Sequence, residues 1–435
     1  MQLHNSDNEP VSLNSGSLEY CGKVAVPYST IYTYDALGRV LTQATPIEEK
    51  DGVIYCKVNR NDFDAAGNVL AQKTTSNLPG EAESYTHTAS VYDSRGRVVD
   101  TVIYDGDKPG SHTRYEYDGV GNRIAVYTGV TDDPGDASKT SYAYNYLNKV
   151  ASITDALGQM ESYVYDSTGL LTEKTDRNGN TTTYLYDAMA RPVSEMVMDP
   201  DSRVTALRNT AYTKTGSKLS EENDTFQTTF QYDCMGHVIR ESETGGVVKA
   251  YGHDWNGNRT AFTLDKGAEN VLSTGYDYDK LNRMYIVREQ GETIATYTYD
   301  DNGNRASLSY PEGTVTTYTY NLANMATRLV NENGGEILSA YEYTYYLNGN
   351  QASKADHEGK VTTYTYDGLG QLTVEEESTG LRVAYEHDRF GNRAQMRVTG
   401  DGDYTVTYEY DKNNRLLRDV KRGRCYGEYG KRHSR

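Results

Sequence analysis

The stretch that decides the fold is Tyr297-Thr298-Tyr299-Asp300-Asp301-Asn302-Gly303-Asn304-Arg305. It recurs along the chain as Tyr-x-Tyr-Asp, two variable residues, Gly, and then Asn or Arg, with clear copies at 32–39 and 115–122. Taking the residue in the Asp position as a marker, we count 17 copies, most often 21 residues apart. A fixed internal period of this length predicts a repeat architecture rather than a set of unrelated domains.

The spacing of the copies carries information of its own. Four copies lack the acidic residue: two have Asn145 and Asn321 in the Asp position, and two degenerate copies, with Lys214 and Tyr346 there, are assigned by spacing. The longer intervals exceed 21 residues mostly by 4, 6 or 8. Side chains alternate along a strand, so an even change in length keeps each side chain on its face. The intervals therefore predict hairpins that are lengthened in some copies.

Each copy is typical of a strand, a tight turn and a returning strand. Tyr-x-Tyr places both rings on one face, and Thr, Tyr and Val favour a pleated sheet. The Asp carboxylate can accept a backbone N–H two residues on. Gly suits the left-handed position after a type I turn, and Asn at the next position also tolerates positive φ. Second turns, such as those at 155–158, 176–179, 311–313 and 357–359, close each unit.

We assign structural roles to the repeated residues. The expected turn residues are Asp35, Gly38, Asp64, Gly67, Asp93, Gly96, Asp118, Gly121, Asp166, Gly169, Asp187, Asp233, Gly236, Asp254, Gly257, Asp279, Asp300, Gly303, Asp367, Gly370, Asp388, Gly391 and Asp411. The expected strand tyrosines are Tyr32, Tyr34, Tyr115, Tyr117, Tyr163, Tyr165, Tyr184, Tyr186, Tyr276, Tyr278, Tyr297, Tyr299, Tyr318, Tyr320, Tyr364, Tyr366, Tyr408 and Tyr410.

The predicted fold class is all-β, a long antiparallel ribbon of 17 repeated β-hairpins. Its strands, about 34 at about 4.8 Å spacing, would extend roughly 160 Å. Turn residues interrupt the sequence before any apolar pattern of period 3.6 can extend over the length of a helix, so almost no helix is expected. The chain has 41 Tyr against 5 Phe and 1 Trp. Tyr suits a sheet with one packed and one wet side, because its ring buries area while its hydroxyl needs a partner.

Charge and composition exclude several function classes. The formal net charge of −18 opposes binding to nucleic acid and to anionic membranes. No stretch approaches 18 apolar residues, so no membrane span is expected. The polar segment from Met1 to Pro10 shows no signal peptide. The spacing of the cysteines predicts free thiols rather than a zinc site or a redox pair; they are Cys21, Cys56, Cys234 and Cys425.

No catalytic residue, metal ligand or cofactor is expected, and the chain is not predicted to be an enzyme. It lacks a phosphate loop, a Gly-x-Ser-x-Gly elbow and a His-Glu-x-x-His motif. Its eight histidines are scattered, and His237 and His387 occupy repeat positions that favour packing or solvent. The loops starting at Asp176, Asp254 and Asp300 resemble calcium loops, but each lacks the Glu that an EF-hand needs six residues after its Gly.

The Tyr-x-Tyr-Asp-x-x-Gly-Asn/Arg pattern resembles the YD repeat of the RHS (rearrangement hotspot) proteins and of teneurins, over about Tyr28 to Lys421. The resemblance implies a ribbon that spirals into a hollow shell. Bacterial members of this family are containers that hold a toxic C-terminal domain until delivery to a competing cell. Animal relatives are cell-surface adhesion receptors.

Two departures from the family pattern predict a fragment. RHS proteins usually close the shell with a segment containing an Asp-Pro-x-Gly motif, and 133–135 and 199–201 do not fit it in pattern or place. No non-repeat domain follows the array to serve as the toxin. The ribbon of roughly 160 Å would wrap once around a shell about 50 Å wide, which makes part of a wall rather than a closed box.

We expect three segments. They are a polar lead-in at 1–27, the repeat array at 28–420, and a basic tail at 421–435 that is disordered or comes from a truncated or altered reading frame. The leading hypothesis is a non-enzymatic shell segment that encapsulates and delivers a C-terminal toxin, with the rest of the shell and that toxin as partners. The full-length protein would be secreted or at the cell surface. The alternative is a cell-surface adhesion module that binds carbohydrate or protein, because exposed Tyr rings can stack on sugars.

Overall fold

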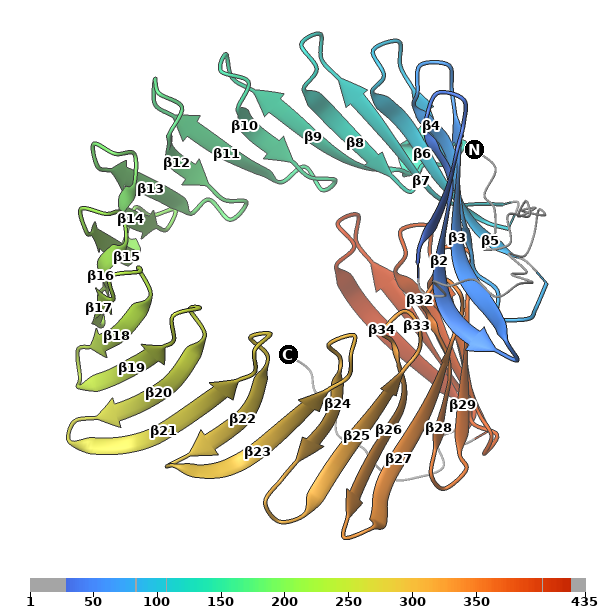
Figure 1. Cartoon of the computed structure of the whole chain (residues 1–435). Helices are drawn as coiled ribbons and strands as arrows, with labels where there is room; N and C mark the ends of the chain where they lie inside the picture. Colours follow the sequence, from blue (N-terminus) through green and yellow to red (C-terminus); the bar gives the residue numbers. More distant parts are fainter. Residues whose placement is uncertain (1–28, 83, 107, 401, 424–435) are drawn as a thin grey trace. The chain divides into compact units, whose positions relative to one another are not determined.

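A computed structural model describes residues 29–82, 84–106, 108–400 and 402–423 (Figure 1). They form one antiparallel sheet of 34 strands, in which neighbours in the sequence pair with one another. One three-residue 3-10 helix, η1 (Pro134–Asp136), is the single helical element of the described residues. The predicted all-β ribbon of hairpins is confirmed. The lead-in at 1–27 and most of the basic tail lie outside the described residues.

The strands are mostly five to eleven residues long. They are β1 (Ile31–Tyr34), β2 (Val40–Lys50), β3 (Val53–Phe63), β4 (Val69–Thr75), β5 (Tyr85–Tyr92), β6 (Val98–Asp105), β7 (Lys108–Tyr117), β8 (Arg123–Thr128), β9 (Ser138–Tyr144), β10 (Val150–Thr154), β11 (Met160–Tyr165), β12 (Leu171–Thr175), β13 (Thr181–Tyr186), β14 (Pro192–Met198), β15 (Val204–Tyr212), β16 (Lys218–Asn223), β17 (Gln227–Tyr232), β18 (Val238–Glu243), β19 (Val247–His253), β20 (Arg259–Lys266), β21 (Glu269–Tyr278), β22 (Met284–Glu289), β23 (Glu292–Tyr299), β24 (Arg305–Ser309), β25 (Thr314–Tyr320), β26 (Ala326–Asn333), β27 (Glu336–Tyr345), β28 (Gln351–Asp356), β29 (Val361–Tyr366), β30 (Leu372–Glu377), β31 (Arg382–His387), β32 (Arg393–Thr399), β33 (Tyr404–Tyr410) and β34 (Leu416–Gly423).

The repeat turn has the same hydrogen bonds in all 17 copies. In the copy between β23 and β24, the Asp300 N–H donates to the Asn304 carbonyl at 2.9 Å, and the Gly303 N–H donates to the Asp300 carbonyl at 3.0 Å. Gly303 has φ +87°, and the register shifts between Thr298 and Tyr299. A type I turn followed by a left-handed residue in a bulge is therefore the local structure. We call it the YD turn.

Two details of the turn differ from the sequence expectation. The Asn that follows Gly, as in Asn68 or Asn304, is absent from the positive-φ residues of the described chain, so the predicted reason for its presence is wrong. Positive φ belongs to the glycine position alone. Where that position is not Gly, φ lies between 56° and 62°, at Asn148, Ala190, Asn282, Asn324 and Asn414.

The assignment of Lys214 to the Asp position is also wrong. The Thr213 N–H donates to the Ser217 carbonyl at 2.8 Å, and the Gly216 N–H donates to the Thr213 carbonyl at 3.1 Å. Thr213 therefore occupies the Asp position, and its hydroxyl accepts the Ser217 N–H at 3.1 Å. This copy therefore begins one residue earlier than the spacing predicted. The strands that precede it, β14 and β15, have a register shift between Val197 and Met198. Tyr346 does occupy the Asp position, as the spacing predicted.

The tyrosine face of the sheet is the more buried face, but it is not a deep core. In β29 the burial alternates, with Thr363 and Thr365 exposed and Tyr364 and Tyr366 half-buried. No large side chain of the described residues is fully buried. This pattern is typical of a single sheet that alternates along each strand between a packed and a solvated side.

Contacts divide the chain into two compact units. Unit 1 comprises Met1–Thr140, Tyr318–Asn331 and Ile337–Arg435, and unit 2 comprises Ser141–Thr317 and Glu332–Glu336. The buried apolar side chains lie in unit 1, except for Ala295 and Leu308. Unit 1 contains two stretches of ribbon that are distant in sequence and in contact with each other. The last strand, β34, continues to Gly423, three residues past the expected end of the array.

Candidate functional site

The YD turns hold their carboxylates in a fixed way. In the turn of Asp64, Oδ1 accepts the Asn68 N–H at 2.8 Å, and Oδ2 accepts the Asn68 side-chain amide at 2.8 Å. In the turn of Asp93, Oδ1 accepts the N–H groups of Arg95 and Arg97, and Oδ2 accepts Arg97 Nε at 2.7 Å. The residue after Gly is often Asn or Arg, and its side chain donates a hydrogen bond to the second carboxylate oxygen.

These hydrogen bonds lower the pKa of the turn carboxyls. The Asn68 side chain, followed by its backbone N–H, holds the pKa of Asp64 below the usual range. The backbone N–H of Arg97, followed by its guanidinium, does the same to the pKa of Asp93. Hydrogen bonds that favour the charged form always act in this direction. The pKa is also lowered at Asp35, Asp118, Asp166, Asp176, Asp187, Asp254, Asp279, Asp300 and Asp411.

An arginine after the positive-φ residue of a YD turn also connects its turn to the next copy. Arg97 donates to the Asp118 carbonyl at 3.3 Å, and its guanidinium lies 4.5 Å from the centroid of the Tyr117 ring. Arg283 likewise reaches the Asp300 carbonyl at 3.4 Å and lies 4.5 Å from the Tyr299 ring. The same stacking joins Arg39 to Phe63 and Arg191 to Tyr212, at 4.6 Å each. We call this arrangement the Arg–aromatic contact between copies.

In many copies the tyrosine just before the Asp position provides another link that the sequence did not reveal. Its hydroxyl donates to the backbone carbonyl of the first residue of the preceding returning strand, for example Tyr186 to Leu171 at 2.7 Å. The same bond joins Tyr92 to Val69, Tyr117 to Val98, Tyr212 to Pro192, Tyr232 to Lys218, Tyr278 to Arg259, Tyr299 to Met284, Tyr345 to Ala326 and Tyr410 to Arg393.

Within unit 1, five successive YD turns of the later stretch contact the opposite ends of hairpins in the earlier stretch. We call these contacts the seam; its turns begin at Asn321, Tyr346, Asp367, Asp388 and Asp411. The Leu322 N–H donates to the Ile47 carbonyl at 3.1 Å, and the Leu347 N–H donates to the Asn77 carbonyl at 3.0 Å. The seam thus begins with paired backbone groups.

The later turns of the seam add side-chain hydrogen bonds. The Gly368 N–H donates to Asp105 Oδ1 at 2.8 Å. Arg389 donates to the Asp136 carbonyl at 2.7 Å and pairs with the Asp136 carboxylate at 3.1 Å. The Ser138 hydroxyl donates to the Lys412 carbonyl. The order of the contacts follows the order of the copies, so the two stretches of ribbon lie in register along the seam.

Apolar side chains of the variable turn positions fill the seam. Leu347 is only 4% exposed. The Phe390 ring lies so close to Gly129 that a Cβ there would be 2.4 Å from it. Leu369 approaches Gly110 in the same way, at 2.3 Å. The seam therefore combines backbone pairing with close apolar packing, which is the composition of a specific interface.

The same turn positions outside the seam are exposed. Leu281 is 71% exposed and Trp255 is 88% exposed, although both occupy variable positions equivalent to those that the seam buries. A repeated row of exposed apolar side chains indicates a surface that another part of a protein covers, whereas single exposed apolar side chains are common. The other large ones are Leu37 and Val120 in unit 1 and Tyr146, Leu147, Met189 and Met235 in unit 2.

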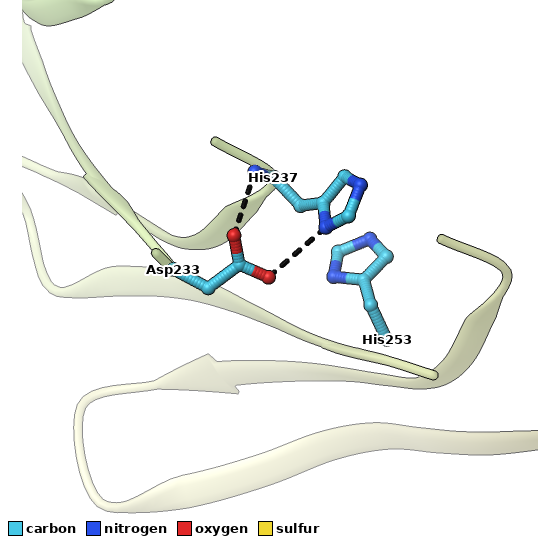
Figure 2. A group of neighbouring side chains, drawn as sticks. All are labelled: Asp233, His237 and His253. Atoms are coloured by element: carbon cyan, nitrogen blue, oxygen red, sulfur yellow. Dashed lines mark hydrogen bonds and ion pairs between the residues drawn. The ribbon is translucent and has the colours of Figure 1, made fainter. Parts of the chain in front are cut away.

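Among the described residues, one group of side chains has the composition of a metal centre, although no metal ligand was expected from the sequence (Figure 2). Asp233 and His237 lie in one YD turn, and His253 ends β19 beside the next turn. Their ligand atoms all lie within 4.8 Å of one another. Asp233 Oδ2 is 3.0 Å from His237 Nδ1, and the two imidazoles stack with centroids 4.9 Å apart.

The remaining candidates do not converge. The carboxylates of the calcium-like loops at Asp176 and Asp254 are bonded to the turn and to the Asn that follows Gly. Cys56 and Cys234 are free thiols, while Cys21 and Cys425 lie outside the described residues. Burial raises the pKa of the Cys56 thiol to about 11. The described part of the chain contains no helix with the length and apolar character needed to cross a membrane.

Comparison with known proteins identifies the repeat. Residues 165–197, 299–336 and 345–377 match the family model of the RHS Repeat. The three segments fall on YD turns and the strands that flank them. No curated protein matches this chain.

Two solved structures share the fold. The first, described as the crystal structure of TcdB2-TccC3-TEV, has a TM-score of 0.55 and 15% identity and covers 89% of this chain. The second, TcdB2-TccC3 without its hypervariable C-terminal region, has a TM-score of 0.54 and 15% identity and also covers 89% of this chain. In each case this chain spans 26% of the length of the other. At this identity the likeness concerns the fold.

Proposed function

The chain carries RHS repeats folded into one antiparallel sheet, and from this premise we propose that it is a non-enzymatic wall segment of an RHS/YD-repeat shell. In the full-length protein the shell would enclose a polymorphic C-terminal toxin and deliver it to a competing cell. The partners would be the rest of the shell and that toxin, and the full-length protein would be secreted. The similar fold of proteins solved as TcdB2-TccC3 supports this proposal.

The seam is the observation that carries the proposal. A ribbon becomes a closed wall only if one winding seals against the next. In unit 1 the YD turns of one stretch meet the hairpin ends of another, with backbone pairing at Ile47 and Asn77 and apolar packing at Leu347. Such contacts suit a container, because they involve only the turns at the ends of the hairpins and leave both faces of the sheet uncovered.

The exposed apolar turns fit the same proposal. Leu281 and Trp255 of unit 2 occupy variable turn positions equivalent to those filled by Leu369 and Leu347 in the seam. In a complete shell a further winding would cover them. This chain spans about a quarter of the two similar proteins, so most of such a shell would be supplied by other segments.

The test is cryo-electron microscopy and limited proteolysis of the full-length polypeptide that contains this segment. We expect a hollow particle in which this segment forms wall, with a non-repeat domain inside that resists protease until the particle is denatured. A particle with an open array, and a non-repeat domain cut as quickly as in isolation, would overturn the proposal.

The alternative, a cell-surface adhesion module, predicts a different result. Purified chain would bind defined glycans or cell-surface proteins through exposed Tyr rings such as Tyr32 and Tyr34, which are 42% and 57% exposed. A glycan array distinguishes the two functions. Saturable binding that Tyr34→Ala removes would favour adhesion over a wall role.

A further inference from the structure

The group of Asp233, His237 and His253 replaces the usual contact between two copies of the repeat. At four other places an Arg follows the positive-φ residue of the turn and stacks on the aromatic residue just before the Asp position of the next copy, at 4.5 to 4.6 Å. Here His237 stands in the Arg position and His253 stands in the tyrosine position. Both partners of one contact have thus changed to the residue that most often binds metals.

The geometry of the three side chains suits a small divalent ion. Zn²⁺ binds imidazole nitrogen and carboxylate oxygen at about 2.0–2.2 Å, which places neighbouring donors in a tetrahedral site about 3.3 Å apart. Asp233 Oδ2 and His237 Nδ1 are 3.0 Å apart, and the His253 ligand atom lies within 4.8 Å of both. Binding of one ion by all three residues would require the His253 ring to turn so that its free nitrogen points to the same ion as Asp233 Oδ2 and His237 Nδ1.

One buried nitrogen of this group has no partner. His253 Nδ1 is buried and makes no hydrogen bond to any described residue. An unsatisfied buried polar atom is costly and calls for an explanation. An ion shared with Asp233 would satisfy it. His237 and Asp233 are about 30% and 28% exposed, so an ion can reach the site from solvent.

The surroundings orient two of the ligands. Asp233 Oδ1 accepts the backbone N–H groups of Met235 and His237 at 2.9 Å each, which leaves Oδ2 for an ion. The His237 ring packs against Gly257, where a Cβ would lie 3.1 Å from Nε2. Outer contacts of this kind fix ligand orientation in metal sites. The YD turn and its neighbour therefore hold the donors on backbone that the repeat already makes rigid.

We propose that Asp233, His237 and His253 bind a first-row divalent transition metal ion, with zinc as the reference ion. Two neutral imidazoles and one carboxylate leave a fourth position open to water. The bound ion joins two adjacent copies of the repeat and takes the place of the Arg–aromatic contact. The net charge of −18 favours the approach of a cation.

The test is a zinc titration of the metal-free chain by calorimetry and thermal unfolding, with Co²⁺ absorption as a report on the ligands. We expect one zinc ion per chain at this site, a rise in Tm with zinc, and visible Co²⁺ bands. His253→Gln should weaken zinc binding by at least about 10-fold, the lower end of the loss seen when even outer contacts are removed.

The decisive control restores the repeat. The double variant His237→Arg/His253→Tyr rebuilds the pair found in other copies, so it should keep the β spectrum and lose the zinc-dependent shift in Tm. His112→Gln is the matched negative control, because His112 pairs with Asp100 without a second histidine, and it should bind zinc as the unaltered chain does. The proposal is overturned if zinc leaves the unaltered chain unchanged, or if the double variant binds zinc equally well.

Discussion

At the scale of single residues, each position of the repeat has one physical task. Asp accepts the N–H groups that its turn leaves free, Gly supplies positive φ, and the Asn or Arg that follows donates a hydrogen bond to the second carboxylate oxygen. In the turn of Asp118 these tasks appear together, because Oδ1 accepts the Asn122 N–H and Oδ2 accepts the Asn122 amide. A substitution should therefore matter according to its position in the turn rather than its exposure.

The turn of Asp118 contains two glycines that test this point. Gly121 has φ +109° and Gly119 does not adopt positive φ. Gly121→Ala should destabilise the turn by about 1–2 kcal/mol, because a Cβ disfavours left-handed backbone. Gly119→Ala should be neutral or stabilising by up to about 1 kcal/mol, since no atom lies within 4 Å of its Cβ. Urea unfolding of the two variants measures both, and equal effects would contradict the turn assignment.

A second prediction at this scale concerns acid. The folded pKa of carboxyls such as Asp64 and Asp93 is lowered, so their stabilising effect is present above the unfolded pKa of about 3.9 and is lost as pH falls through the folded pKa. Tm should therefore be steady near neutral pH and should fall as pH drops below about 4.

Two copies provide the internal control for the acid prediction. In the turns of Asn145 and Asn321 an amide oxygen accepts the same backbone N–H groups. An amide does not titrate in this range, so hydrogen exchange in these turns should be less affected by acid than in the turn of Asp93. Equal loss of protection in both kinds of turn would mean that the carboxylates are not the source of the pH dependence.

At the scale of elements, hairpins are joined to one another by two recurring links. The Arg–aromatic contact reaches forward to the next copy, and the tyrosine hydroxyl reaches back to the preceding returning strand. These links explain why a sheet with so few fully buried side chains is regular along its length. They also explain the abundance of Tyr over Phe, because a Phe ring would leave the carbonyl without this donor.

Tyr186 and Tyr184, both on β13, allow the stabilising effect of the hydroxyl to be measured apart from that of the ring. Tyr186 donates to the Leu171 carbonyl at 2.7 Å, and Tyr184 makes no hydrogen bond through its hydroxyl to any described residue. Tyr186→Phe should cost about 1 kcal/mol, the usual net value of such a bond, while Tyr184→Phe should cost much less. Hydrogen exchange of β12 and β13 reports the difference. A larger effect at Tyr184 would show that the hydroxyl bond is not the link.

At the scale of the whole molecule, burial depends on contact between distant stretches of sequence. The seam joins residues 253 to 275 positions apart. Unit 1, which contains the seam, holds most of the buried apolar residues of the described chain, while the YD turns of unit 2 keep theirs exposed. A protein that works as a wall needs this interface more than it needs a thick core.

Substitutions at Leu347 and Leu281 test how much the seam stabilises the fold. Both are leucines in the variable positions of a YD turn, and they are 4% and 71% exposed. Leu347→Ala should cost about 2–5 kcal/mol and should speed exchange of the amides around Asn77, whereas Leu281→Ala should change stability by no more than about 0.5 kcal/mol. Chemical unfolding with hydrogen exchange checks both. A small, local effect of Leu347→Ala would mean that the seam does not form in solution.

The sequence by itself determined the hairpin, the turn type and the single antiparallel sheet, because each turn depends on residues within five positions of one another and each strand pairs with the next one along the chain. Local reasoning failed at Lys214, where a threonine one residue earlier makes the turn, and at the Asn after Gly, whose task is a hydrogen bond to Asp. Only the tertiary structure decided the seam and the group of Asp233, His237 and His253. The seam depends on packing between copies more than 250 residues apart, and the histidines meet because adjacent strands place two different repeat positions side by side, which a one-dimensional pattern does not show.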